Sequence, residues 1–378
     1  MVTEPVQASR VLKLSRPTVY LDQWMWVALA KAENGKGDSR EIKAFEAVKN
    51  AAESGVAFPL SSTTYSETLS GVTDPNQRMT LARTVASISY MRTLRAPQVL
   101  VEHQFRTAMH AQFGRPTFRP APIDVLGHGA HWAFRGEAGG FTFSAPEVET
   151  LIPRTTMTEV YQWAEFRLFA GPRDDQVASL RANGYNPEAA AASMSSRVDW
   201  ENHLYTALKN EGMAKPSAPV LRFFVQAREV LHEHNRLLYE LFHEYNMSVE
   251  RTFSGKDVKT ARRKLSNFSD AVPSLRIAAD LKTHLFRQRK PWTTNPIRDI
   301  DALAHAVPYS DVVVPDREMI SLLTRSKTAE AFGTTIAHLE DLPSALGPLA
   351  ARAERLGDDR TGWGGNTFRL DPPPGVTF

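Results

Sequence analysis

The sequence predicts an α/β fold with a parallel sheet, interrupted by a large and mainly helical insertion. The first observation is a short apolar strand at 17–22, which is followed by a helix at 23–33. A second helix at about 40–54 and a second short strand at 56–60 come next. This alternation of strands and helices is typical of a parallel sheet with helices packed against it.

The same alternation returns after residue 295. Asn295 suits a helix N-cap and Pro296 suits the first helical position, and Pro308 is expected to end this helix. A strand at 311–315, another helix and a last strand at 332–336 follow. We therefore expect one α/β domain assembled from both ends of the chain.

Between these two parts the pattern changes to long helices. With 378 residues the chain is long enough for a second domain or for one large insertion. The long helical patterns lie at 78–95, 159–170, 200–210 and 221–245. We predict a discontinuous α/β domain at 17–75 and 291–356, a mainly helical insertion at 76–290 and a tail at 357–378.

Composition excludes several classes of function. The chain has no cysteine, which excludes disulfide scaffolds, thiol catalysis and cysteine-ligated zinc. No apolar run approaches the length of a membrane span, and the N-terminus has no apolar signal core. We therefore expect a cytoplasmic protein without membrane partners.

The charge distribution carries more information than the net charge of +3. Residues 251–290 contain eleven Lys or Arg against three Asp, a local excess of 11 − 3 = +8. The densest cluster is Arg262, Arg263 and Lys264. A solvated helix face is one interpretation of such a run. Because the run leads directly into an acidic segment, phosphate binding by these three residues is the other.

Acidic residues follow two of the predicted strands. Asp22 ends the first strand and Asp316 follows the strand at 311–315, so both are expected at the carboxyl edge of the sheet, where open α/β sheets bind ligands. Glu67 and Asp301 lie on helices that lead to the same edge. Converging carboxylates repel one another unless cations neutralise them, and an all-oxygen set suits Mg²⁺ or Mn²⁺.

Each acid also has a simpler interpretation. An aspartate after a strand is commonly a turn or cap residue, and Glu67 could be a first-turn acid favoured by the helix dipole. Asp299 could pair with a neighbouring arginine, and Asp311 is expected to be structural. The metal-site hypothesis therefore depends on the combined order of the acids.

Taken together, these residues resemble the PIN-domain nucleases, which include the VapC-type toxins of bacteria. The resemblance lies in Tyr20-Leu-Asp22, Ser66-Glu67, the run at 301–306 and the run at 311–319. It implies a PIN-like three-layer α/β/α sandwich, a Mg²⁺ or Mn²⁺ site and endonucleolytic cleavage of RNA, commonly structured or transfer RNA. It also suggests a protein inhibitor, or antitoxin, as a partner.

The resemblance assigns Asp22, Glu67, Asp301 and Asp316 to the family's four acids. The chain departs from the family pattern where Gln23 replaces the usual hydroxyl residue after the first acid. Two further expectations concern the helix after residue 295. Asp299 could share the role of Asp301, since only one of two residues two apart would be well aimed. His305, four residues after Asp301, could bond that carboxylate or a substrate phosphate, or could be a buried structural histidine.

The sequence thus predicts a metal-dependent endoribonuclease. The alternatives are a non-catalytic RNA-binding or regulatory protein with a degenerate PIN fold, and a structure-specific DNA nuclease. Trp24 and Trp26, beside the first acid, are expected to pack in the core, with base stacking as a second interpretation.

Overall fold

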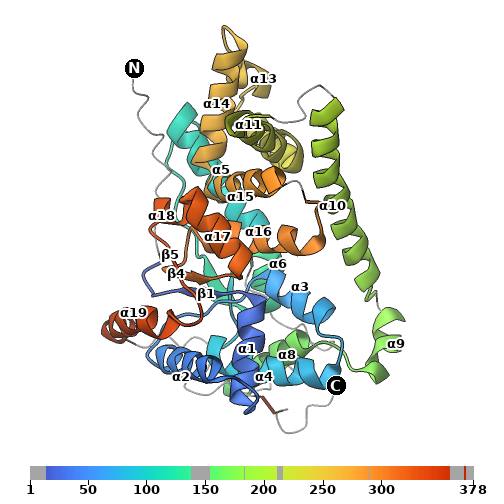
Figure 1. Cartoon of the computed structure of the whole chain (residues 1–378), viewed down its shortest axis with the longest axis vertical. Coiled ribbons are helices and arrows are strands. Elements are labelled where there is room, and N and C mark those ends of the chain that lie inside the picture. Colours follow the sequence, from blue (N-terminus) through green and yellow to red (C-terminus); the bar gives the residue numbers. More distant parts are fainter. Residues whose placement is uncertain are drawn as a thin grey trace.

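A computed structural model describes residues 14–137, 154–182, 184–210, 216–288, 290–357 and 370–371. The fold is a mixed α/β arrangement in which helices greatly outnumber strands (Figure 1). None of the described helices combines the length and apolar character that crossing a membrane requires. The predicted tail at 357–378 falls almost entirely outside the described residues.

A small parallel sheet joins the two ends of the chain. Strand β1 (Val19–Leu21) pairs with β4 (Val312–Val314), and β4 pairs with β5 (Thr335–Ile336), all in parallel. The segment 56–60, predicted as a strand, lies beside β1 through a parallel bridge between Thr18 and Ala57. The predicted strands at 17–22, 311–315 and 332–336 are confirmed as β1, β4 and β5, each shorter than expected, whereas the segment 56–60 forms only isolated bridges.

Two further strands were not predicted from the sequence. Strand β2 (Arg92–Leu94) pairs antiparallel with β3 (Leu126–His128). A parallel bridge between Leu60 and Thr93 connects β2 to the segment 56–60. Both strands lie inside the predicted helical insertion, so part of that region extends the strand layer.

Nineteen labelled helical segments surround the strands within the described part of the chain. In the first half they are α1 (Gln23–Glu33), α2 (Ser39–Glu53), α3 (Ser62–Gly71), α4 (Pro75–Ser89), α5 (Pro97–Phe113), α6 (Gly129–Arg135), α8 (Arg154–Ala170) and α9 (Asp174–Ala182). In the second half they are α10 (Pro187–Asn210), α11 (Ala218–Arg228), the π-helix η1 (Glu229–Glu233), α12 (Asn235–Glu244), α13 (Val249–Phe253), α14 (Val258–Ala271), α15 (Pro273–Gln288), α16 (Thr294–Ala306), α17 (Arg317–Ser326), α18 (Thr328–Ala331) and α19 (Leu342–Leu356).

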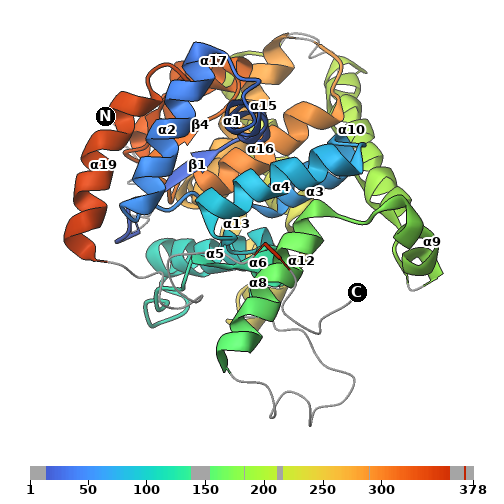
Figure 2. The ribbon, with the colours of Figure 1, turned by 90° about the horizontal axis from the view of Figure 1, so that it is seen from below.

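Helices cover both faces of the parallel sheet. Along β1, Val19 and Leu21 belong to one buried cluster, while Tyr20 belongs to another, because successive side chains of a strand point to opposite faces. The first cluster includes residues of α1, α2, α4, α8 and α19. The second includes residues of α15, α16 and α17. Helices α2 and α19, from opposite ends of the sequence, lie side by side (Figure 2).

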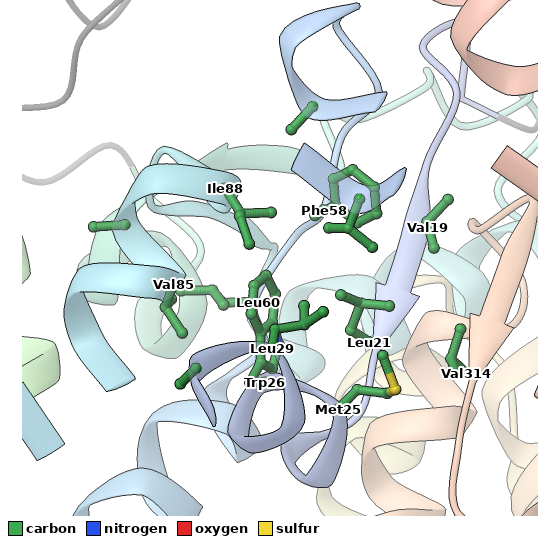
Figure 3. Close-up of a cluster of buried hydrophobic side chains, with 14 of the residues drawn as sticks. Val19, Leu21, Met25, Trp26, Leu29, Phe58, Leu60, Val85, Ile88 and Val314 are labelled. Carbon is green, nitrogen blue, oxygen red and sulfur yellow. The ribbon is translucent and has the colours of Figure 1, made fainter. Parts of the chain in front are cut away.

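The first cluster contains residues from both sides of the predicted boundary between the α/β part, which ends at residue 75, and the insertion, which begins at residue 76. Val85 and Ile88 of α4 pack in the same cluster as Leu21 of β1 (Figure 3). The aromatic ring of Phe58 is fully buried there as well. The start of the predicted insertion therefore shares a core with the α/β part, and a third apolar cluster, built on α5, α12 and α14, fills the far end of the molecule.

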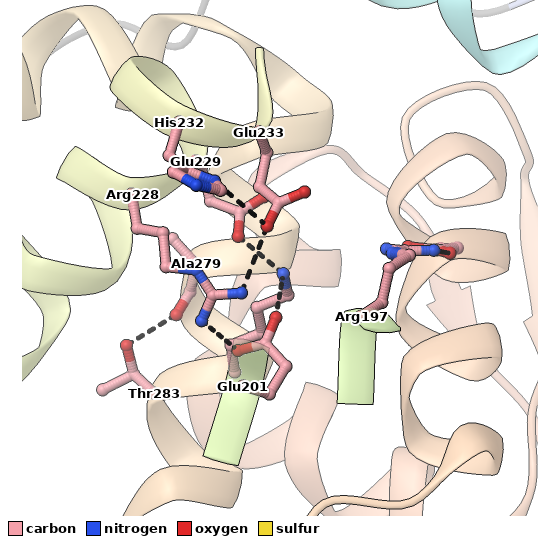
Figure 4. Close-up of polar contacts among 10 residues, drawn as sticks. Arg197, Glu201, Arg228, Glu229, His232, Glu233, Ala279 and Thr283 are labelled. Atoms are coloured by element: carbon pink, nitrogen blue, oxygen red, sulfur yellow. Dashed lines mark hydrogen bonds and ion pairs between the residues drawn. The ribbon is translucent and has the colours of Figure 1, made fainter. Parts of the chain in front are cut away.

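A buried ionic network ties α10 to α15 and η1. The ammonium of Lys282 on α15 lies 2.8 Å from Glu201 and 2.6 Å from Glu229, and its side chain is only 3% exposed. Arg228 adds contacts to Glu201 at 2.7 Å and to Glu233 at 3.1 Å (Figure 4). The π-helix interrupts the helix predicted at 221–245 and places Glu229 and Glu233 in this network.

We expect Phe58→Ala to lower the free energy of unfolding by about 3–5 kcal/mol, because it leaves a cavity in the core that joins the two chain ends. The matched control is Phe118→Ala, since Phe118 is 65% exposed. That substitution should change stability by no more than about 0.5 kcal/mol. Chemical denaturation of both variants is the measurement, and equal losses would contradict the described core.

Lys282→Met should cost about 3–5 kcal/mol, because it leaves two buried glutamates without their cation. Lys290→Met is the control, since the Lys290 side chain is 73% exposed and its ammonium lies as far as 3.9 Å from the Glu318 carboxylate. Exposed pairs of this kind contribute about 0–1 kcal/mol. Similar urea midpoints for the two variants would argue against the network.

Candidate metal-binding site

Asp22 and Asp316 follow neighbouring parallel strands at the same edge of the sheet. Leu21 of β1 is paired with Val314 of β4, and the Asp22 amide donates to the Val314 carbonyl at 3.3 Å. Asp22 caps α1 by accepting a hydrogen bond from the Gln23 amide at 2.8 Å. The sheet register therefore brings together two acids that are almost 300 residues apart in the sequence.

Asp316 has the same local role as Asp22. Its Oδ1 accepts a hydrogen bond from the Met319 amide at 2.7 Å and caps α17. The interpretation of both aspartates as cap residues is therefore correct. Each cap involves a single carboxylate oxygen, so the capping role leaves the second oxygen of each carboxylate available to a ligand.

Glu67 and Asp299 complete the acidic group from two helices. Glu67 lies on α3 and Asp299 on α16, and these helices are in contact. Both side chains are partly buried. The charge of Asp299 interacts with Asp22, Asp316 and Glu67. We call Asp22, Glu67, Asp299 and Asp316 the edge acids.

Burial and mutual repulsion raise the pKa values of three edge acids. Burial is the main cause for each of them. It raises the pKa of Asp22 to about 6, with Asp316 adding repulsion, and that of Glu67 to about 7, with Asp22 adding repulsion. The pKa of Asp299 rises to about 8, because it is buried and faces Asp22, Asp316 and Glu67. Arg298 opposes the shift at Glu67.

Asp301 lies away from this group. Its carboxylate forms a two-pronged ion pair with Arg197 of α10, with N···O distances of 2.5 and 2.9 Å. Successive helical residues are rotated by about 100°, so Asp301 points nearly opposite to Asp299. Within α16, Asp299 is therefore the acid that faces the sheet edge, and the sequence interpretation that favoured Asp301 did not anticipate its pairing with Arg197.

His305 has a structural environment. Its Nδ1 donates a hydrogen bond to the Asp301 carbonyl oxygen at 2.7 Å, one helical turn away, rather than to the Asp301 carboxylate. Burial lowers the pKa of this imidazole. The expected contact with the carboxylate is absent among the described residues, and the interpretation as a buried structural histidine fits this environment.

The predicted basic cluster lies on α14, which Figure 1 places near one end of the molecule, with α15, α16 and α17 between it and the strands. Arg262 stacks over the Phe223 ring at 5.1 Å. Lys264 donates to the carbonyl oxygens of Thr252 and Ser254 at 3.1 and 2.7 Å. All three residues are exposed, and two of the three predicted phosphate ligands, Arg262 and Lys264, have local structural partners.

The edge acids supply the kind of donors that a hard cation prefers, because all of them are carboxylates. Among the residues that the structure describes, however, no three His, Asp or Glu side chains are grouped closely enough to hold a metal ion as they stand. The set therefore fits Mg²⁺ or Mn²⁺ by chemistry, and side-chain movement would have to complete the coordination.

A pocket of about 290 Å³ opens beside Asp316 and was not predicted from the sequence. It lies between the starts of α1, α2 and α17, and we call it the Trp24 pocket. The sequence does indicate that one of the two indole rings is accessible, because Trp24 and Trp26 are two residues apart on a helix and cannot both face the core. The pocket is lined by Trp24, Asp38, Arg40, Glu41, Pro315, Asp316, Arg317, Ile320, His338, Leu339 and Glu340.

Comparisons with known proteins add no relative. No family model matches the sequence, and neither the curated proteins nor the solved structures contain a match.

The raised pKa values predict how stability depends on pH. The folded protein binds more protons at Asp22, Glu67 and Asp299 than the unfolded chain does between about pH 4 and 8, so stability falls as pH rises through this window. Mg²⁺ needs deprotonated ligands and should restore stability at pH 8 more than at pH 5. Melting temperatures measured in EDTA and in Mg²⁺ test this.

Asp299→Asn should raise the melting temperature in EDTA at pH 8 and reduce the increase caused by Mg²⁺. The control is Glu46→Gln, at an exposed position of α2, which should change neither value. A Mg²⁺ effect that is equal at both pH values, or unchanged in Asp299→Asn, would contradict coordination by the edge acids.

Proposed function

We propose that this protein is a metal-dependent endoribonuclease with a PIN-like α/β/α core. The observation that carries the proposal is the meeting of four acids from both ends of the chain at one sheet edge. Three of them have pKa values raised by burial and by one another's charge. Such a group is stabilised by a cation of high charge density.

Mg²⁺ or Mn²⁺ would be held by Asp22, Glu67, Asp299 and Asp316. A divalent ion bound by carboxylates can deprotonate a water for in-line attack on a phosphodiester and stabilise the leaving oxygen. Asp22 and Asp316 are already oriented by their capping hydrogen bonds. Glu67 and Asp299 are side chains that can move toward a cation, because the structure describes no hydrogen bond that holds either carboxylate.

Positive groups near the edge could receive the substrate. Arg298 lies close enough to Glu67 for its positive charge to oppose part of the rise in the Glu67 pKa. Arg317 follows Asp316 directly in the sequence. Cations of this kind offset the repulsion between the edge acids and a phosphate backbone. Arg263 remains exposed on α14 and is a candidate for a more distant phosphate contact.

RNA is proposed as the substrate because the acids resemble those of the PIN-domain nucleases. Structured or transfer RNA, a cytoplasmic location and a protein inhibitor or antitoxin belong to the same proposal. A DNA nuclease would use the same metal chemistry. RNA and DNA of identical sequence, each tested with and without EDTA, separate these two functions.

A non-catalytic RNA-binding role is the second candidate. The observation that favours it is the absence of a preassembled three-ligand group among the described residues. It predicts RNA binding that weakens steeply with salt and no cleavage with added Mn²⁺. Cleavage that stops in EDTA would exclude it.

Asp22→Asn and Asp299→Asn should each lower the rate of RNA cleavage by about 100-fold or more, since even changes around the ligands of a metal site cost about 10–100-fold. Asparagine caps helices as well as aspartate does, so Asp22→Asn should fold normally. Single-turnover cleavage in Mn²⁺ is the measurement. Wild-type rates in purified, folded Asp22→Asn would rule out the mechanism.

Asp301→Asn tests which residue of α16 is the third acid of the site: Asp299, as we propose, or Asp301, as the sequence resemblance implies. It should lower the free energy of unfolding by about 1–2 kcal/mol through the weakened Arg197 contact, yet preserve cleavage. If Asp301→Asn abolished cleavage and Asp299→Asn did not, Asp301 would be the third acid despite its ion pair.

A further inference from the structure

The Trp24 pocket shares a wall with the edge acids. Asp316 lines the pocket, and its charge also acts on Asp22 and Asp299. A group bound in the pocket therefore lies next to Asp316, one of the four edge acids. With about 290 Å³, the pocket is at the small end of ligand sites, which suits a single small unit such as one nucleotide.

Three of the pocket's four acidic side chains are already satisfied within the protein. Asp38 and Glu340 both pair with Arg40 at 2.9 Å. Glu41 accepts a hydrogen bond from the Asp38 amide at 2.8 Å, in a capping box. These contacts hold Arg40 in place and offset part of the negative charge of the rim, although four carboxylates against two arginines leave the lining net negative. Asp316, the remaining acid, belongs to the edge acids.

Arg317 is the cation left for a ligand. It is exposed, and no hydrogen bond or ion pair to it occurs in the part of the chain that the structure describes. It follows Asp316 directly in the sequence and lines the same pocket. Arginine is well suited to this role because its planar fork matches phosphate oxygens.

Trp24 adds an aromatic surface to the lining of the pocket. Its side chain is 36% exposed, whereas Trp26, two residues further along α1, is fully buried in the core. An indole ring that remains accessible inside a pocket is a stacking surface for a base, since every base has a π-face. Leu339 and Pro315 add apolar walls.

We propose that the Trp24 pocket binds one unpaired nucleotide of single-stranded RNA, adjacent to the phosphodiester at the edge acids. The base stacks on Trp24 and the phosphate contacts Arg317. This inference rests on the proposed nuclease function and specifies its substrate: the bound nucleotide is unstacked, so a loop or a single strand is preferred over a duplex.

The test combines a protein substitution with a substrate substitution. A single abasic nucleotide is moved along an unpaired oligoribonucleotide, and cleavage in Mn²⁺ is measured with wild-type protein and with Trp24→Ala. One abasic position next to the cleaved bond should lower wild-type kcat/KM by about tenfold or more, as expected for loss of one stacked base. Trp24→Ala should show the same loss with the intact RNA and no further loss at that position.

Three control variants support the interpretation. Trp24→Phe, which retains a stacking ring, should recover most of the activity. Phe118→Ala removes another exposed ring and should behave as wild type. Arg317→Ala should raise KM more than it lowers kcat. Deoxy versions of the same oligonucleotides show whether the pocket also accepts DNA. Circular dichroism confirms that each variant is folded.

Binding in EDTA separates this inference from the proposed function. If wild-type protein cleaves nothing but its binding to the intact oligonucleotide still depends on Trp24 and on the same abasic position, the pocket is supported and the nuclease proposal fails. If wild-type protein cleaves and the abasic effect persists equally in Trp24→Ala, the pocket proposal is overturned. Unchanged binding and cleavage in Trp24→Ala also overturn it.

Discussion

The parallel pairing of β1 with β4 is the constraint on which the rest of the structure depends. It joins residues almost 300 positions apart and is reinforced by Asp311, whose carboxylate accepts from the Thr18 amide at 2.8 Å and from Arg352 at 2.7 Å. Because the strands run in the same direction, the residues that follow them meet at one edge. Asp22 and Asp316 are adjacent for this reason, and their repulsion follows from the fold itself.

The inserted helices decide which further acids reach that edge. The two-pronged Arg197 contact holds Asp301 against α10, and the rotation of the helix then turns Asp299 toward Asp22. Helix α10 is itself tied to α15 by the buried contact between Lys282 and Glu201. The ionic network in the helical part thus occupies Asp301, while Ile297, Ile300 and Leu303 hold α16 in the second buried cluster.

Much of the α/β part could be predicted from the sequence, because its signals are local. The helix predicted at 23–33 matches α1 from Gln23 to Glu33, and the strand after Pro308 forms as expected, since apolar runs and cap residues lie next to one another in the chain. Strands β2 and β3 escaped prediction because their sequences, Arg-Thr-Leu and Leu-Gly-His, lack the continuous apolar character of β1 and β4, which are equally short.

The site was only partly predictable, for a different reason. Asp22, Glu67 and Asp316 follow from strand and helix order, whereas the choice between Asp299 and Asp301 depends on a long-range ion pair with a residue about 100 positions away. The Trp24 pocket is formed by the starts of three helices from distant parts of the sequence. Contacts of this kind are set by tertiary packing, and apart from the spacing of Trp24 and Trp26 no local pattern indicates them.

The central claim is that the edge acids form one cation site. Anomalous diffraction from crystals grown with Mn²⁺ tests it most directly, because the signal locates the ion independently of activity. The account predicts an anomalous peak within coordination distance of Asp22 and Asp316, with Asp299 or Glu67 turned toward it. A peak at Asp301 instead, or no peak at saturating Mn²⁺ and pH 8, would contradict it.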